Sequence, residues 1–171
     1  MEWNHVDMEN RYWTLPTSKN GNPNLIYLND QALAVLQSIP QIEGARFVFS
    51  TDGKRPVSGF SKWKKAVDAL APKVADWRLH DLRRTMSTSM QRLAVNFHVK
   101  EACLNHTVKG ISKHYDKYEY LPEKKAAWNR WGGLLSRVVA GDAAAVEAFV
   151  ASFRPVEPGE ELPANVVALR A

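Results

Sequence analysis

The sequence predicts an α+β domain that is mostly helical, with a small β-hairpin near its N-terminus packed on a helical bundle. Two observations carry this prediction. Segments 11–15 and 24–28 are rich in β-forming residues and flank Asn20-Gly21, a strong signal for a hairpin turn. After residue 29, helix caps and apolar residues at helical spacing alternate with Pro and Gly breakers.

The elements are expected in the following order. Residues 1–4 indicate the end of an element and residues 7–10 a polar turn, before the hairpin of residues 11–28. Asn29-Asp30 caps a helix to about Ser38, and residues 47–49 form a short buried strand. Further helices are expected from a cap at Ser58 or Ser61 to Pro72, over 80–93, 95–105 and 122–140, and from Asp142 to about Phe153, whereas 109–120 is helical or irregular.

Length and charge suggest one domain that meets a polyanion. The chain has 171 residues and a formal net charge of +5. Residues 54–125 hold 16 Lys and Arg against 7 Asp and Glu, a local excess of +9, whereas residues 140–171 carry −3. We expect a domain over residues 1–140, a short helix and flexible tail over 141–171, and double-stranded DNA as the partner of the basic middle.

Several classes of protein are disfavoured. Cys103 is the single cysteine, which excludes an internal disulfide framework and a multi-cysteine metal site. The sequence shows no cluster of metal ligands, and we expect no metal and no cofactor. No apolar run approaches the roughly 20 residues that cross a bilayer, and no secretory signal opens the sequence. We therefore expect no membrane partner and a cytoplasmic, nucleoid-associated protein.

The stretch Trp77 to Thr85 contains the first candidate site. On a helix, His80 and Arg83 stand on one face, three residues apart. Arg offers a fixed fork of donors to a phosphate, and His exchanges a proton near neutral pH. Taken alone, a solvated helix face of mixed charge explains the pair better, because short motifs match by chance.

Three other residues change that balance. Lys19 precedes a hairpin turn, His106 follows the helix of residues 95–105, and Tyr115 stands among lysines. Separately, each has an ordinary explanation as a solvated turn residue, a helix-end histidine or an amphipathic packing residue. Together with His80 and Arg83 they suit one reaction, the attack of a tyrosine oxygen on a DNA phosphodiester. A phenol with a pKa near 10 needs cations and a base for that attack, and the transition state needs fixed donors.

These residues resemble the catalytic domain of the tyrosine recombinases, the phage integrase family. His80-Asp81-Leu82-Arg83 fits the family's H-x-x-R, and Leu104-Asn105-His106 lies nine residues before Tyr115, as in the family. The resemblance covers about residues 2–139. It implies that Tyr115 forms a 3′-phosphotyrosyl link, that Lys19 is the general acid, that Arg83 clamps the transition state, and that His80 and His106 bind phosphate and transfer protons. Tyr118 and Tyr120 lie close enough to compete as nucleophile, but the spacing favours Tyr115. Four further basic residues are expected to contact DNA: Arg78, Arg84, Lys109 and Lys113.

The chain departs from the family pattern in two places. The residue before the second histidine is often Gly and here is Asn105, which we expect to be harmless. The family's first catalytic arginine would precede Met1, so the domain is expected to be truncated at its N-terminus or decayed. One preorganised donor contributes about 2.7–4 kcal/mol in other enzymes, so its loss would slow cleavage by orders of magnitude.

Three functions therefore stay open. The first is site-specific DNA recombination or integration by strand cleavage and rejoining, and the second is a catalytically inactive DNA-binding remnant of an integrase. The third is an enzyme like the type IB topoisomerases, which shares the chemistry. Separately, the expected helix 122–140 could join copies of the chain on DNA through Trp128, Trp131, Leu135 and Val138, or these residues could pack on their own core.

Overall fold

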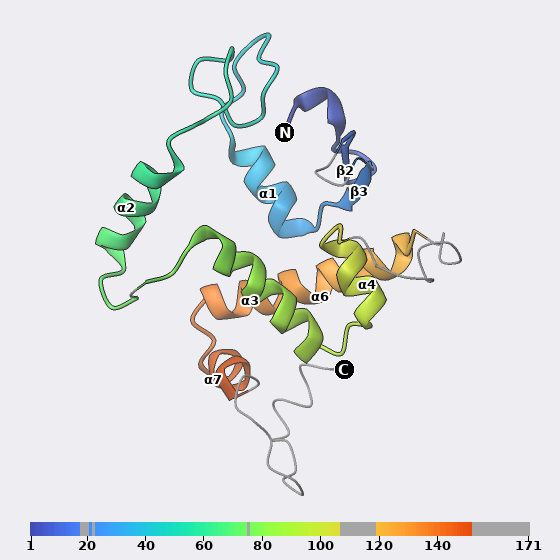
Figure 1. The fold of residues 1–171 in the computed structure, drawn as a ribbon, viewed down its shortest axis with the longest axis vertical. Helices are drawn as coiled ribbons and strands as arrows, with labels where there is room; N and C mark the ends of the chain where they lie inside the picture. Colours follow the sequence, from blue (N-terminus) through green and yellow to red (C-terminus); the bar gives the residue numbers. More distant parts are fainter. Residues whose placement is uncertain (18–20, 22, 75, 107–118, 152–171) are drawn as a thin grey trace, which may run out of the picture.

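The protein combines one small sheet with several helices. The computed structural model describes residues 1–17, 21, 23–74, 76–106 and 119–151. Figure 1 shows the sheet and helix α1 in one half, helices α3, α4 and α6 crossing one another in the other half, and helix α2 standing apart from both. This arrangement confirms the predicted α+β class, with helices predominating.

The sheet has three antiparallel strands in the order β1 (Val6–Asp7), β2 (Tyr12–Leu15) and β3 (Asn24–Tyr27). The predicted hairpin is β2–β3, with Trp13 opposite Ile26. Strand β1 was not predicted, and it follows a 3₁₀ turn, η1 (Trp3–His5). The expected polar turn is the connection from β1 to β2: the carboxylate of Asp7 accepts from the backbone N–H of Asn10 at 2.8 Å.

Helix α1 (Asp30–Ser38) begins as predicted, because the side chain of Asn29 accepts from the backbone N–H of Ala32 at 3.0 Å. Its buried face joins the sheet in a first hydrophobic cluster, which we call the sheet core. The buried members of the sheet core are Leu28, Leu33, Leu36 and Val48, with Trp3 and Trp13 partly buried against them.

The predicted strand at residues 47–49 is wrong. Only an isolated bridge joins Phe47 to Glu2, although Val48 is buried as expected. Directly afterwards the chain turns, and the carboxylate of Asp52 accepts from the backbone N–H groups of Lys54 and Arg55 at 2.9 Å each. Side-chain acceptors in this loop replace the strand partners that a longer ladder would have supplied.

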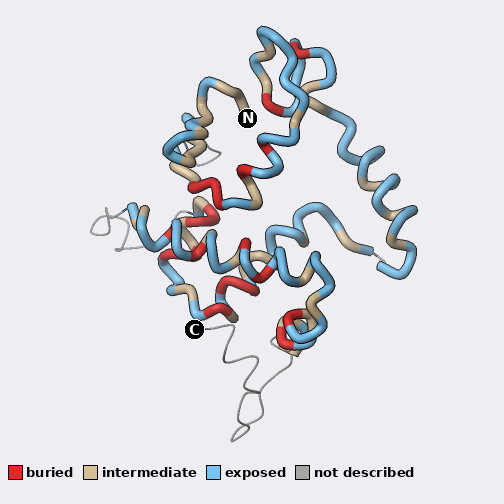
Figure 2. The backbone as a smooth tube through the Cα atoms, turned by 180° about the vertical axis from the view of Figure 1, so that it is seen from behind, coloured by how far each residue is buried: buried red, intermediate tan, exposed pale blue. Residues whose placement is uncertain are grey.

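A second hydrophobic cluster, the helix core, lies where α3 (Leu79–Arg92), α4 (Phe97–Cys103) and α6 (Leu121–Val139) meet. Its buried members are Met90, Val99, Cys103 and Ala127, and Met90 is 0% exposed. Figure 2 shows the buried segments of these helices in red. Helix α6 has Pro122 in its first turn, and α7 (Ala143–Ala151) follows a cap by Asp142, both as predicted.

The buried face of α6 differs from the predicted stripe of large residues. Lys124, Ala127, Gly132 and Leu134 are buried, whereas Leu135 is 38% exposed. A Cβ on Gly132 would lie 2.1 Å from the side-chain oxygen of Gln31 and 2.3 Å from the side-chain nitrogen of Asn29. Helix α6 therefore approaches the start of α1 at Gly132, where a side chain would collide with Asn29 and Gln31.

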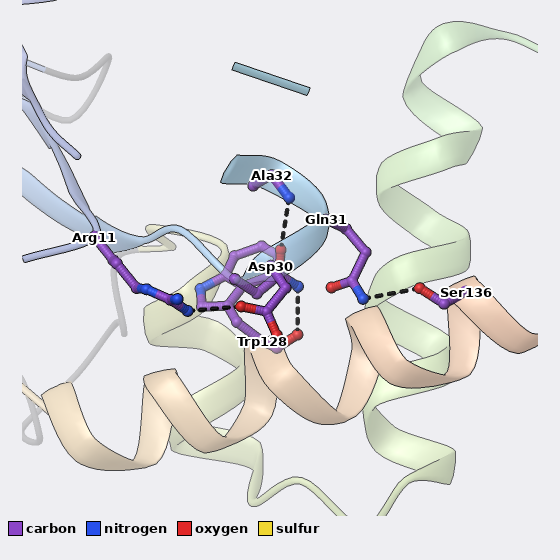
Figure 3. Close-up of polar contacts among 7 residues, drawn as sticks. Arg11, Asp30, Gln31, Ala32, Trp128 and Ser136 are labelled. Atoms are coloured by element: carbon purple, nitrogen blue, oxygen red, sulfur yellow. Dashed lines mark hydrogen bonds and ion pairs between the residues drawn. The ribbon is translucent and has the colours of Figure 1, made fainter. Parts of the chain in front are cut away.

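Polar contacts join the two cores, and we call this set the seam (Figure 3). The amide of Asn29 donates to the backbone carbonyl of Trp128 at 2.8 Å, and the amide of Gln31 donates to Ser136 at 2.8 Å. The ammonium group of Lys124 donates to the carbonyl of Leu25 at 2.7 Å and to the side chain of Asn24 at 3.1 Å. The sheet half is thus fastened to α6 at three places.

Helix α2 (Phe60–Leu70) packs differently from the others. Its N-cap is Gly59, with φ at 77°, in place of the expected Ser58 or Ser61. The apolar residues that predicted it are largely exposed, with Trp63 at 58% and Leu70 at 87%. No part of the described chain, α2 included, forms a helix both long and apolar enough to cross a membrane.

Candidate functional site

The predicted phosphate face lies at the start of α3. The carboxylate of Asp81 accepts from the backbone N–H of Arg78 at 2.8 Å and so closes the first turn of the helix. His80 and Arg83 follow one turn apart, and both residues are exposed. Arg78 and Arg84, two of the predicted DNA contacts, are also exposed at this end of α3, where Arg84 pairs with Asp81 at 3.2 Å. The N-terminal end of α3 therefore presents a group of cations to solvent.

Arg83 connects α3 to the end of α4. Its guanidinium group donates to the backbone carbonyl of Leu104, the residue that caps α4. Carbonyls at a helix C-terminus lack partners within the helix, so this contact satisfies one of them. It also brings the arginine to the segment that carries His106, two residues further along the chain. The contact thus links Arg83 to the segment of His106, although the two residues lie 23 positions apart in the sequence.

Asn105 explains how the chain turns at this point. Its φ of 53° is left-handed, a conformation that Gly adopts readily and Asn adopts more easily than most other residues. The backbone N–H of Asn105 donates to the carbonyl of Ala102 at 3.1 Å, and that of His106 donates to the carbonyl of Glu101 at 3.0 Å. These two bonds form a Schellman motif, with Asn105 at the left-handed position that Gly most often occupies in such motifs.

The Schellman motif places His106 against Glu101. The imidazole Nδ1 of His106 lies 2.8 Å from the carboxylate of Glu101, whose second oxygen lies 3.3 Å from the ammonium of Lys100. The side chain of Glu101 is only 18% exposed, whereas that of His106 is 47% exposed. Burial raises the pKa of Glu101, but the hydrogen bonds from His106 and Lys100 outweigh it, and the pKa lies below its ordinary value. Glu101 is therefore an ionised partner of His106.

The sequence prediction did not include Glu101. The sequence does contain a signal for Glu101. In a Schellman motif, the backbone N–H of the residue after the left-handed position donates to the carbonyl of the residue five positions earlier in the chain. With Asn105 as the left-handed residue, the returning residue is His106 and the one it covers is Glu101.

A cavity of about 270 Å³ lies between the hairpin and the end of α4. His106 and Asn105 line it from the α4 side, and Thr14 and Asn24 line it from strands β2 and β3. Its other lining residues are Pro23, Leu25, Ala102, Glu119, Leu121 and Lys124. The cavity therefore lies at the seam and borders the ends of β2 and β3 that are next to their connecting loop.

Lys124 and Cys103 are the strongly buried ionisable groups near this cavity. Burial lowers the pKa of Lys124, against the opposing influence of the Cys103 thiolate and Glu119. Burial raises the pKa of the Cys103 thiol to about 11. The thiol is therefore protonated and unreactive at neutral pH, consistent with a residue that packs in the helix core.

Four of the predicted site residues lie outside the described residues: Lys19, Lys109, Lys113 and Tyr115. The described residues on either side of them are nevertheless informative. His106 and Glu119, which bracket residues 107–118, both line the cavity. Thr14 and Pro23, on either side of the hairpin tip, line it as well.

Within the described ranges, no three His, Cys, Asp or Glu side chains come together in a way that could hold a metal ion. In a comparison with protein-family models, the model described as the phage integrase family matches residues 1–120. Searches of curated proteins and of solved structures give no match. The matched range begins at Met1 and includes the hairpin, the start of α3, the end of α4 and Tyr115.

Proposed function

Because the chain belongs to the phage integrase family, we propose that it acts in site-specific DNA recombination by cleaving and rejoining a strand through Tyr115. The observation that carries the proposal is the contact between Arg83 and the end of α4, since it unites the H-x-x-R helix with the segment of His106. Family membership also implies DNA as the partner, and the exposed arginines at the start of α3 suit its phosphates.

Chain connectivity supports the roles of Tyr115 and Lys19. Tyr115 lies four residues before Glu119, and Lys19 lies four residues before Pro23. Glu119 and Pro23 both line the cavity that His106 also lines, which supports a proposed site at this cavity to which Tyr115 and Lys19 would contribute. A tyrosine nucleophile, a lysine acid and a histidine, together with an arginine bonded to the residue two positions before that histidine, suit attack on a single phosphodiester.

The reaction can be written with all atoms accounted for. The phenol oxygen of Tyr115 attacks phosphorus, and its proton passes to a histidine, His80 or His106. The bond from phosphorus to the 5′-oxygen breaks, and Lys19 protonates the departing oxygen. The products are a 3′-phosphotyrosyl link and a 5′-hydroxyl group. Arg83 stabilises charge on the non-bridging oxygens throughout, and attack by another 5′-hydroxyl reverses the sequence to join a new strand.

Trapping of the covalent link tests this proposal. The probe is a pool of duplexes of randomised sequence, each with a 5′-bridging sulfur at one phosphodiester. A thiolate departs without a proton and religates poorly, so even slow cleavage accumulates as adduct. We expect an adduct that survives denaturation, with the DNA attached to Tyr115 by peptide mass mapping. Tyr115→Phe should abolish it, and Tyr118→Phe and Tyr120→Phe, matched changes in the same segment, should preserve it.

Other outcomes point elsewhere. An adduct that persists in Tyr115→Phe would overturn the assignment of the nucleophile. DNA binding that weakens with salt, without any adduct, would favour the non-catalytic DNA-binding remnant, because phosphate contacts dominate such affinity. Relaxation of supercoiled DNA without exchange of strands would indicate the topoisomerase-like reaction.

Two further parts of the proposal concern other regions of the chain. Lys109 and Lys113 would extend the phosphate contacts of Arg78 and Arg84 and, like them, lower the affinity for DNA of any sequence when removed. Oligomerisation on DNA would involve helix α6, where Leu135 is 38% exposed. Sedimentation with and without DNA tests the second point, since a monomer under both conditions would exclude it.

A further inference from the structure

The contact between Glu101 and His106 has a consequence for the chemistry of the histidine. Two hydrogen bonds join the same two residues: one from the His106 backbone to the carbonyl of Glu101, at 3.0 Å, and one between Nδ1 and the carboxylate, at 2.8 Å. The first fixes the backbone of His106 and the second fixes the orientation of its ring. An imidazole held at both places has little rotational freedom left.

The carboxylate also determines where the ring proton lies. An ionised carboxylate only accepts hydrogen bonds, so Nδ1 of His106 must carry hydrogen whether the ring is neutral or protonated. The nitrogen that gains or loses a proton is then Nε2. Nε2 has no hydrogen-bond partner among the residues that the structure describes, and the His106 side chain is 47% exposed at the cavity.

Lys100 keeps the carboxylate in place. Its ammonium group lies 3.3 Å from the second oxygen of Glu101 and 4.9 Å from the centre of the Phe97 ring. The side chain of Lys100 is 10% exposed, so the ion pair is shielded from solvent more than most surface pairs. Glu101 is thereby held between a lysine anchored on α4 and the ring of His106.

We propose that Glu101 is a positioning residue, which holds His106 in its Nδ1–H form and reserves Nε2 for the DNA phosphate. This inference rests on the proposed function, because it assigns Glu101 a part in the same site. At the phosphate, Nε2 of the neutral ring accepts a proton from Tyr115, and Nε2–H of the protonated ring donates a hydrogen bond to a non-bridging oxygen. Glu101 itself touches neither the DNA nor the reacting atoms.

The first test observes the proton directly and needs no DNA. In the full chain with ¹⁵N-labelled histidine, long-range ¹H–¹⁵N spectra distinguish Nδ1–H from Nε2–H rings. His106→Gln identifies the signal, and spectra are recorded at rising pH until the neutral ring is observed. We expect Nδ1–H in the native protein, a change toward Nε2–H in Glu101→Ala, and retention of Nδ1–H in Glu101→Gln, whose amide oxygen also accepts.

An Nε2–H ring in the native protein, or an unchanged tautomer in Glu101→Ala, would overturn the inference. The native measurement alone can do so, which covers the case in which Glu101→Ala fails to fold. These outcomes leave the proposed function intact, since that function depends on loss of the adduct in Tyr115→Phe. The two ideas can therefore fail separately.

The second test measures adduct formation on the phosphorothiolate duplexes. We expect Glu101→Ala to slow adduct formation by about tenfold to a hundredfold, the range known for loss of the hydrogen-bond partner of a metal-binding histidine, and Glu101→Gln to restore most of the rate. In a His106→Gln background, Glu101→Ala should cause no further loss, because its effect acts through His106. Additive losses in the double variant would show a merely structural role and contradict the proposal.

Discussion

The sheet core and the helix core are built in different ways. The helix core closes around Met90, which is 0% exposed, and three helices surround it. The sheet core is rimmed by partly buried side chains from η1, β1 and β2, Trp3 and Trp13 among them. Between them lies the seam, where named polar bonds replace a continuous apolar interior.

This difference explains where the candidate site lies. Arg83 and His106 belong to the helix half, whereas the hairpin that carries Lys19 belongs to the sheet half. The proposed reaction would need groups from both halves at one phosphodiester. Apolar packing tolerates rearrangement, but hydrogen bonds require defined distances and angles. The seam can therefore fix the relative position of the halves more sharply than a second apolar cluster would.

The largest expected effect comes from the helix core. Met90→Ala should lower the free energy of unfolding by about 2–5 kcal/mol, because it leaves a cavity among residues that cannot collapse around it. Leu82→Ala, on the same helix but 60% exposed, is the control and should change it by less than about 0.5 kcal/mol. Urea unfolding followed by circular dichroism measures both.

The same variants test whether the seam couples the cores. Trp3 and Trp13 report on the sheet core, and Trp128 and Trp131 pack against the helix core. If the seam holds the halves together, Met90→Ala lowers the midpoint for all of these probes equally. Separate transitions for the two pairs of tryptophans would show that the cores unfold independently and that the seam is weak.

Whether the sequence predicts a structural feature depends on whether that feature is determined by residues close together in the chain. The cap at Asn29, the β2–β3 hairpin, and the helices after Arg78 and Pro122 depend on nearby residues, and all were predicted. The expected strand at Phe47 failed because its partner is the distant Glu2 and the ladder ends after one bridge. The exposure of Trp63 on α2 could not be predicted from the sequence either, because periodicity predicts an apolar face but not whether another element covers that face.

The site shows the same division. His80 and Arg83 lie one turn apart on the same helix, and the sequence predicts this placement from helical spacing. The contact of Arg83 with Leu104 depends on how α3 meets the end of α4, and the buried Lys124 donates its hydrogen bonds to β3, neither of which a local pattern contains. Gly132 is the clearest case: in the sequence it interrupts an apolar stripe, and only the fold reveals the close approach of Asn29 and Gln31.

Gly132 and Gly133 offer a matched pair for testing the seam, with an intermediate expected effect. Gly132→Ala should lower the free energy of unfolding by about 1–3 kcal/mol, because its Cβ would collide with the side chain of Asn29, which is bonded to both Ala32 and Trp128. Nothing lies within 4 Å of a Cβ on Gly133, so Gly133→Ala should raise it by about 0.5–1 kcal/mol through helix propensity alone. Thermal unfolding measures the pair.

A destabilised Gly133→Ala would show that α6 does not tolerate a side chain in this turn for reasons other than the seam. A Gly132→Ala protein as stable as Gly133→Ala would show that α1 can move away from α6 at little cost. In that case the halves are held loosely, and the hairpin's position over the cavity would need another explanation.

The smallest expected effect is the pH dependence that Lys124 contributes at the seam. Burial lowers its pKa, so the folded protein releases this proton at a lower pH than the unfolded chain does. Between the two pKa values the unfolded chain binds more protons, and the free energy of unfolding therefore rises with pH toward about 10.4. Lys124→Met should remove this rise. Lys125→Met is the control, because it removes an equal charge from an exposed position on the same helix and should leave the rise in place.

Cys103 must be separated from this effect, because its sign is opposite. With a pKa raised to about 11, the folded thiol keeps a proton that the unfolded chain loses at lower pH, so its contribution to stability falls as pH rises. Comparing native Lys124 with Lys124→Met in a Cys103→Ala background removes the thiol and its charge interaction with the lysine. Denaturant titrations at several values between about pH 8 and pH 10 should then show that the free energy of unfolding of the protein with Lys124 rises with pH relative to that of the Lys124→Met variant. A difference that stays constant or shrinks would mean that the ammonium group is solvated at the seam, and that its bonds to Asn24 and Leu25 hold the hairpin without a desolvation cost.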